Sequence, residues 1–194
     1  MFSSAYSLFP MPKIETPRLV LRKMTMRDAE DVFAYSRDAQ VAKHVLWSAQ
    51  QNLREAKDFI RLQRSRYRRD EPASWGIILR ETGHLVGTIG YMEYNPDHAS
   101  CELGYSLARP LWNRGYMTEA LSAVIDHTFE TMDINRIEAQ HEVENPASGR
   151  VMEKCGMRKE GVLRGRLYNK GRYVDVCLYA ILRGDPRPSS RKED

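Results

Sequence analysis

The sequence has 194 residues and a formal net charge of +4, with 42% hydrophobic and 29% charged residues. This length fits one domain with a sizeable core, and the composition is that of an ordinary globular protein without an apolar run long enough to span a bilayer. The opening segment MFSSAYSLFPMPK lacks the basic and apolar regions of a secretory signal, so we expect a cytoplasmic protein with no membrane partner.

The cysteines and the charge distribution narrow the protein class further. Cys101, Cys155 and Cys177 are an odd number, without CxxC spacing or clustered histidines, which predicts buried thiols and no metal site. A basic run, RLQRSRYRR at residues 61–69, carries much of the positive charge. We interpret it as a solvated helix face and predict no direct nucleic-acid recognition, because no nucleic-acid-binding motif accompanies it.

The first third of the chain predicts a strand followed by two helices. ETPRLVLRKM, residues 15–24, has the pattern of a strand entered through a proline. Thr25 and Asp28 lie at capping-box spacing at the start of TMRDAEDVFAYSRD, and residues 48–67 repeat apolar side chains at helical spacing. Residues 1–13 are expected to form an N-terminal extension.

The remaining two thirds predict more sheet. SWGIILR, LVGTIGYM and ASCELGYSL, joined by the turns ETGH and NPDH, are typical of a three-stranded antiparallel meander. A long helix, the strand NRIEAQHEV, the helix NPASGRVMEKCG and a hairpin over residues 160–183 follow. The order predicts an α/β (α+β) domain over residues 14–183, with a mixed, mostly antiparallel seven-stranded sheet flanked by helices, and a disordered polar tail over 184–194.

The segment LWNRGYMTEALSAVIDHTF, residues 111–129, begins a helix with a glycine and without an acidic residue at its first positions. Backbone N–H groups and the positive end of the helix dipole meet at such a start, which predicts an anion site after the strand that ends at Leu107. The chain has neither GxxxxGK[ST] nor GxGxxG, so nucleoside triphosphates and dinucleotides lose their main support as ligands.

Within this segment, WNRGYMTEAL resembles the W-G-K-G-Y-A-T-E-A stretch of the GNAT superfamily of N-acetyltransferases, in its ribosomal-protein (Rim-type) branch. Three other segments resemble the same branch in the same order: ETPRLVLRKMTMRDAEDVF, CELGYSL and ENPASGRVMEKCGMRKEGVLR. Together they cover about residues 14–182. The resemblance implies the GNAT fold and acetyl transfer from acetyl-CoA to a primary amine.

The resemblance also implies which residues bind the cofactor. The backbone of residues 113–118 would hold the coenzyme A diphosphate, Asn145 would contact the pantetheine, and backbone N–H groups near Leu107 would serve the oxyanion. Asn145 as a plain helix N-cap, and Arg150 as a solvated side chain, stay open as alternatives. Asn113 and Met117 replace residues that are more often small in the family, so we expect a slightly different loop. The implied cofactor residues are Leu107, Asn113, Arg114, Gly115, Tyr116, Met117, Thr118, Asn145 and Arg150.

Amine acetylation requires a group that accepts the amine proton and a donor for the departing thiolate. Strand alternation places Glu102 on the face of the strand opposite to the apolar residues of CELGYSL. This is the position where many GNAT enzymes carry the glutamate that accepts the amine proton. We expect Glu102 to be the base; a surface glutamate or ion-pair partner is the alternative.

The sequence offers two candidates for the donor to the departing thiolate. Many relatives use a tyrosine as the general acid, and Met152 occupies that position here. Ser148 matches the serine that Rim-type enzymes place near the thioester sulfur. We expect Ser148 to replace the tyrosine, with a second capping role as the alternative and Tyr168 as a weaker candidate. His44 and His141 have no partner at catalytic spacing and are interpreted as structural or solvated.

A single modest base suits an α-amine, since neutralising an α-amine at pH 7 costs about 1 kcal/mol and a lysine about 4.6 kcal/mol. The resemblance to enzymes that modify ribosomal-protein N-termini agrees. Acetylation of a small amine such as a polyamine, an antibiotic or an amino acid stays open, as does a CoA-binding module without catalysis. Either a monomer or a homodimer is compatible with the sequence.

Overall fold

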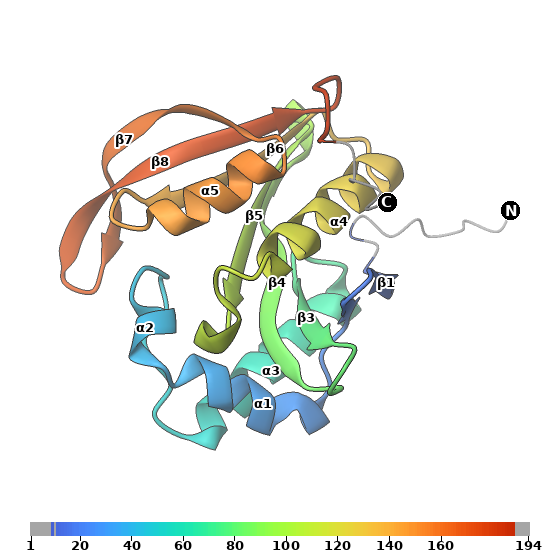
Figure 1. The fold of residues 1–194 in the computed structure, drawn as a ribbon, viewed down its shortest axis with the longest axis vertical. Coiled ribbons are helices and arrows are strands. Elements are labelled where there is room, and N and C mark those ends of the chain that lie inside the picture. Colours follow the sequence, from blue (N-terminus) through green and yellow to red (C-terminus); the bar gives the residue numbers. More distant parts are fainter. Residues whose placement is uncertain (1–8, 10, 189–194) are drawn as a thin grey trace, which may run out of the picture.

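Residue 9 and residues 11–188 are described in a computed structural model of the chain. Eight strands form one sheet in the order β1-β2-β3-β4-β5-β6-β8-β7, and all neighbours are antiparallel except β5 and β6 (Figure 1). The strands are β1 (Ile14–Glu15), β2 (Leu19–Arg22), β3 (Ser74–Leu79), β4 (Leu85–Asn95), β5 (Ser100–Leu107), β6 (Arg136–Glu142), β7 (Arg158–Asn169) and β8 (Arg172–Leu182).

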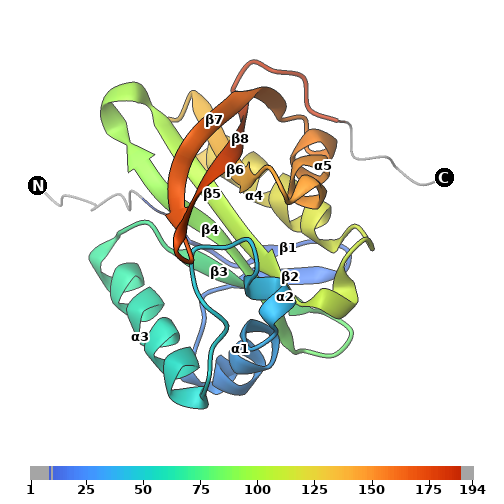
Figure 2. The ribbon, with the colours of Figure 1, turned by 90° about the vertical axis from the view of Figure 1, so that its left-hand side faces the viewer.

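Helices cover both faces of the sheet (Figures 1 and 2). Strand alternation explains the two layers: Leu19 and Leu21 are buried in a core with α4 and α5, whereas Val20 packs on a second core with α1 and α3. No helix in the described part of the chain is long and apolar enough to cross a membrane. The helices are α1 (Ala29–Ser36), α2 (Ala39–Ala42), α3 (Leu53–Arg69), α4 (Tyr116–Thr131) and α5 (Pro146–Lys154).

The sheet has one strand more than the seven that the sequence predicts. The first predicted strand is divided into β1 and β2, because Pro17 has no N–H and the chain turns there, with the Thr16 N–H donating to the Leu19 carbonyl oxygen at 3.0 Å. The predicted capping box is confirmed: Asp28 accepts from the Thr25 N–H at 2.7 Å, and a short 3-10 turn leads into α1. The C-terminal hairpin is also confirmed, with Lys170 and Gly171 at positive φ between β7 and β8.

The two ends of the described chain pack on the domain. Phe9 and Met11, within the predicted N-terminal extension, are buried in the main core. At the other end, the Leu182 N–H donates to Asp185, and Arg187 forms an ion pair with Asp126 at 2.6 Å. Asp185 and Arg187, in the first part of the predicted disordered tail, therefore contact the domain, and residues 189–194 lie outside the described residues.

The parallel pair β5 and β6 positions the site. Their pairing covers only Ser100–Glu102 against Arg136–Glu138, and the rest of β5 pairs with β4 alone. Helix α4 makes the crossover between the two strands, and α5 follows β6. The C-terminal ends of β5 and β6 and the N-termini of α4 and α5 are therefore brought to one side of the molecule.

Candidate active site

A cavity of about 500 Å³ opens where β5 and β6 stop pairing. Its wall combines the end of β5, the loop before α4, the first turns of α4 and α5, and the segment around α2. Lys43, Arg150 and Lys154 give the wall a positive charge. The predicted site residues that line this cavity are Leu107, Asn113, Gly115, Tyr116, Met117, Thr118, Asn145, Ser148 and Arg150.

The loop before α4 is shaped by two residues in the left-handed backbone region. Asn113 has φ 59° and Gly115 has φ 78°, a conformation that costs little for asparagine and glycine. The Trp112 indole N–H donates to the Leu107 carbonyl oxygen at 2.8 Å and fixes the loop to the end of β5. Gly115 stands at the N-cap of α4 and has no side chain that could cap the helix. The first N–H groups of this 16-residue helix therefore lie at the cavity wall without a side-chain acceptor.

Arg114 is the exception among the predicted loop residues, because it does not line the cavity. Its carbonyl oxygen accepts a hydrogen bond from Arg18 at 2.9 Å, which ties the loop to the start of β2. The contact that the structure gives Arg114 is therefore made by its backbone.

The first turn of α4 does contain an acid, Glu119, but its carboxylate is bound elsewhere. Thr16 and the Arg18 side chain each donate to it at 2.6 Å, and the Arg18 N–H donates at 2.8 Å. Although burial opposes ionisation, these hydrogen bonds hold the pKa of Glu119 below its ordinary value. The negative charge of Glu119 is therefore compensated outside the cavity.

Helix α5 begins after Asn145, whose side chain lines the cavity and does not cap the helix. Asn145 stands at the predicted N-cap position, but the alternative of a side-chain cap is not realised: the turn is held by the Asn145 N–H, which donates to the Glu142 carbonyl oxygen at 2.7 Å. The Asn145 amide is left available to a ligand in the cavity.

Ser148, in the first turn of α5, also lines the cavity, and its hydroxyl lies 2.8 Å from that of Tyr105 on β5. Met152 is fully buried, so the usual tyrosine position holds an apolar core residue. Tyr168 is 63% exposed, packs on Tyr173 at the β7–β8 hairpin and is not among the residues that line the cavity.

Glu102 lies on β5 where the pairing with β6 ends and is not among the residues that line the cavity. Its carboxylate accepts from Gln140 on β6 at 2.9 Å. Burial raises the pKa of Glu102 above its ordinary value; the Gln140 hydrogen bond opposes this, and the charges of Glu93 and Glu138 on the two neighbouring strands add to it. A carboxylate with a raised pKa is a better proton acceptor than an ordinary surface glutamate.

His44 and His141 both contact Glu142 at the end of β6. His44 Nδ1 lies 2.8 Å from the Glu142 carboxylate, and His141 Nδ1 donates to its carbonyl oxygen at 2.7 Å. Burial lowers the pKa of His141, which keeps its ring neutral. His141 does not line the cavity, which agrees with its structural interpretation, whereas His44 lines the cavity and has a carboxylate partner in Glu142 that the sequence did not reveal.

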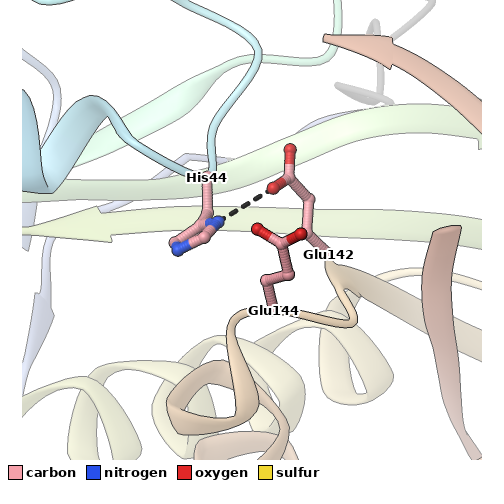
Figure 3. Close-up of side chains that lie close together, drawn as sticks. All are labelled: His44, Glu142 and Glu144. Carbon is pink, nitrogen blue, oxygen red and sulfur yellow. Dashed lines mark hydrogen bonds and ion pairs between the residues drawn. The ribbon is translucent and has the colours of Figure 1, made fainter. Parts of the chain in front are cut away.

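His44, Glu142 and Glu144 lie close together (Figure 3), with their possible ligand atoms within 4.8 Å of one another, and His44 and Glu144 also line the cavity. However, Arg172 donates to Glu144 at 2.9 and 3.0 Å, and Asn169 donates to Glu142 at 2.5 Å. These donors already give both carboxylates hydrogen-bond partners. We therefore interpret the cluster as a set of contacts that joins the segment after α2 to the β7–β8 hairpin, rather than as a metal centre.

Two parts of the site have little signal in the sequence. The α2 segment, including Lys43 and His44, is too short for helical periodicity to reveal it. Tyr105 has only the alternation of β5 as a signal, which places it with the core residues Leu103 and Leu107 and says nothing of its hydroxyl.

Residues 18–158 match the family model described as an acetyltransferase (GNAT) domain. The chain is 33% identical over 172 residues to the uncharacterized N-acetyltransferase YoaA of Bacillus subtilis, covering 89% of this chain and 97% of that protein. The crystal structure of a GNAT-family acetyltransferase from Bacillus anthracis aligns with a TM-score of 0.79 at 31% identity, over 89% of this chain and 99% of the other.

A second solved structure has the same fold and contains ligands. The microcin C7 self-immunity acetyltransferase MccE, solved with acetyl-CoA and AMP, aligns with a TM-score of 0.81 at 20% identity, over 91% of this chain and 98% of that one. Two relatives with named substrates match about half of the chain. The ribosomal-protein-serine acetyltransferase of Escherichia coli is 31% identical over 104 residues (54% of this chain, 58% of that protein), and the spermidine N(1)-acetyltransferase of Vibrio cholerae is 29% identical over 99 residues (51% and 57%).

Proposed function

Since this chain belongs to the GNAT family of acetyl-CoA-dependent N-acetyltransferases, we propose that its acceptor is the α-amine of a peptide or protein. The observation that carries the proposal is Glu102, a half-buried carboxylate of raised pKa beside the point where β5 and β6 part. One such base can take a proton from an α-amine, whose neutralisation costs about 1 kcal/mol at pH 7, far more readily than from a lysine at about 4.6 kcal/mol.

The cavity fits acetyl-CoA as the acyl donor. The uncapped N–H groups at the start of α4, in residues 115–118, supply donors for a diphosphate, and Arg150 adds positive charge from α5. Asn145 offers its amide to the pantetheine, and the Leu107 backbone lies at the end of β5 where a carbonyl oxygen would need a donor. Each of these side chains or backbone groups lines the same cavity, which supports their joint assignment.

In the proposed reaction, Glu102 accepts the amine proton, directly or through water, as the nitrogen attacks the acetyl carbonyl carbon. Strand alternation places Glu102 on the face of β5 opposite Tyr105, so the acceptor would approach from the side away from Ser148. Ser148, on the cavity side, would then donate a hydrogen bond to the departing sulfur. Met152 provides no alternative donor, because it is an apolar residue in the core.

One observation favours a second candidate, a small polyamine. Glu93, Glu102 and Glu138 lie directly opposite one another on three adjacent strands, a row of carboxylates that suits a polycation. Arg136 already donates to Glu138, which weakens this attraction. The named relatives include both a ribosomal-protein and a spermidine acetyltransferase, so they do not favour one acceptor.

The test is an acceptor panel with acetyl-CoA, in which thiol release is measured and the modified nitrogen is located by mass spectrometry. We compare a peptide with a free N-terminus, the same peptide with a blocked N-terminus and an internal lysine, and spermidine. Acetylation of the free N-terminus at a kcat/KM at least about tenfold above the other two supports the proposal. Preference for spermidine, or for the blocked peptide's lysine, would refute it.

A further inference from the structure

The hydroxyl of Ser148 has a partner that the proposed reaction does not yet use. Tyr105, on β5, places its hydroxyl oxygen 2.8 Å from Ser148 Oγ and 3.1 Å from the Ser148 carbonyl oxygen. Both side chains line the cavity. The two hydroxyls therefore form a pair at the wall where the acyl donor would lie.

Two arrangements of the protons keep the hydrogen bond between the two hydroxyls. In the first, Tyr105 donates to the Ser148 carbonyl oxygen, and the Ser148 hydroxyl donates back to Tyr105. In the second, Tyr105 donates to Ser148 Oγ, and the Ser148 proton is free to point into the cavity. Only the second arrangement offers a donor to a ligand, since each hydroxyl has one proton.

We propose that Tyr105 is a positioning residue that turns the Ser148 hydroxyl proton toward the sulfur of the acyl donor. When the carbon–sulfur bond breaks, the electron pair goes to sulfur, and Ser148 donates a hydrogen bond to the resulting thiolate without losing its proton. The thiolate later takes a proton from water. The inference rests on the assignment of Ser148 under the proposed function, and it adds the group that makes Ser148 a donor.

The surroundings of Tyr105 keep its phenol protonated. Burial raises the pKa of Tyr105 above its ordinary value; the hydrogen bond with Ser148 opposes the rise, and the nearby Cys155 thiol and Tyr179 phenol add to it. Burial likewise raises the pKa of Cys155 to about 11. At neutral pH the Tyr105 phenol therefore stays protonated, and we assign it the role of a hydrogen-bond donor rather than of an acid that transfers its own proton.

The first test titrates the thiol of coenzyme A bound to the protein. Thiolate absorbance is recorded against pH, and the spectrum of a complex with a coenzyme A analogue that lacks the sulfur is subtracted, which cancels the protein's own thiols and phenols. We expect Tyr105→Phe to raise the bound thiol pKa by about one unit, because one neutral hydrogen bond is worth about a tenfold change. Ser148→Ala should raise it by at least as much, and the double variant no further than Ser148→Ala.

Tyr91→Phe is the matched control. Tyr91 is another buried tyrosine, with its hydroxyl 2.8 Å from Thr128 Oγ1, and it does not line the cavity. Its loss should leave the bound thiol pKa unchanged. In steady-state assays, Tyr105→Phe should lower kcat about tenfold with KM for acetyl-CoA within about twofold of wild type, whereas Tyr91→Phe should leave kcat unchanged.

The outcomes separate the proposals. An unchanged thiol pKa in Tyr105→Phe, with a raised value in Ser148→Ala, would overturn the role of Tyr105. An unchanged value in both would overturn Ser148 as the sulfur donor and Tyr105 with it. Because the titration contains no amine, an error in the proposed acceptor cannot produce either result. If the defects of the two single variants multiply in the double variant, the two hydroxyls act independently and the proposal is wrong.

Discussion

Replacing Glu102 with glutamine tests the proposed base while preserving shape. The Gln140 side chain donates to Glu102 at 2.9 Å, and the carbonyl oxygen of a glutamine at this position can accept the same hydrogen bond. The variant therefore removes proton acceptance and one negative charge, and keeps the contact that orients the side chain. Binding of acetyl-CoA should be almost unchanged, since Glu102 does not line the cavity.

The expected loss in kcat at pH 7 is about 100-fold to 10,000-fold, the usual contribution of a general base. The defect should shrink as the pH approaches the pKa of the acceptor amine, because more of the amine then arrives neutral. Initial rates with a peptide acceptor between pH 6 and about 9.5, at saturating acetyl-CoA, measure this dependence.

The same substitution should make the fold more stable at neutral pH. The folded-state pKa of Glu102 is raised by burial, so the native protein binds more protons than the unfolded chain between the unfolded and folded pKa values. Stability from this group is therefore lost as the pH rises through that window, and a neutral glutamine escapes the loss. Thermal unfolding at pH 7 should show a higher Tm for Glu102→Gln, and at pH 4 the difference should be smaller.

The combination of a slower reaction and a more stable fold is what a functional buried carboxylate predicts. A wild-type rate at pH 7 would refute Glu102 as the base. An equal defect at every pH would instead indicate that Glu102 positions the amine. Glu93→Gln is the matched control: Glu93 lies opposite Glu102 on β4, and its side chain is exposed, so its loss should change the rate by less than about threefold.

Three further predictions concern the cofactor and the fold. Acetyl-CoA should raise the Tm in a thermal-shift assay while ATP and NAD at equal concentration do little; an equal rise with ATP would contradict the assignment of the loop. Gly115→Glu should abolish acetyl-CoA binding in calorimetry without unfolding the chain, because a carboxylate would repel the diphosphate, whereas Gly115→Asn, which tolerates the φ of 78°, should still bind. Asp28→Asn should cost about 2 kcal/mol in urea unfolding at pH 7, since the charged pair with Arg22 at 2.7 Å is lost. Burial opposes ionisation of Asp28, but hydrogen bonds from Arg22 and Thr25 lower its pKa, so this difference should be full above about pH 4 and fade as the pH falls further.

Local patterns determined most of the fold in advance. Apolar periodicity and turn residues predict the meander, the long helix after Gly115 and the hairpin at Lys170 and Gly171, because each depends on neighbours within a few residues. The match of ordered segments to one family predicts ten site residues besides Glu102, on β5, in the loop before α4, on α4 and on α5. Nine of these ten line one cavity, and Arg114 is the exception. One local feature was missed: the chain turns at Pro17, so the first predicted strand is divided into β1 and β2 and the sheet has eight strands.

Only the tertiary structure decides contacts between residues far apart in the chain. Glu119 has no partner among its neighbours in the sequence, but the fold brings Arg18 to it across about a hundred residues. Likewise, Tyr105 meets Ser148 because β5 and α5 flank the place where the sheet parts, and Glu142 meets His44 because the segment after α2 contacts the end of β6. A hydroxyl or carboxylate gains its partner from packing of distant elements, and the periodicity that places its backbone carries no information about that partner.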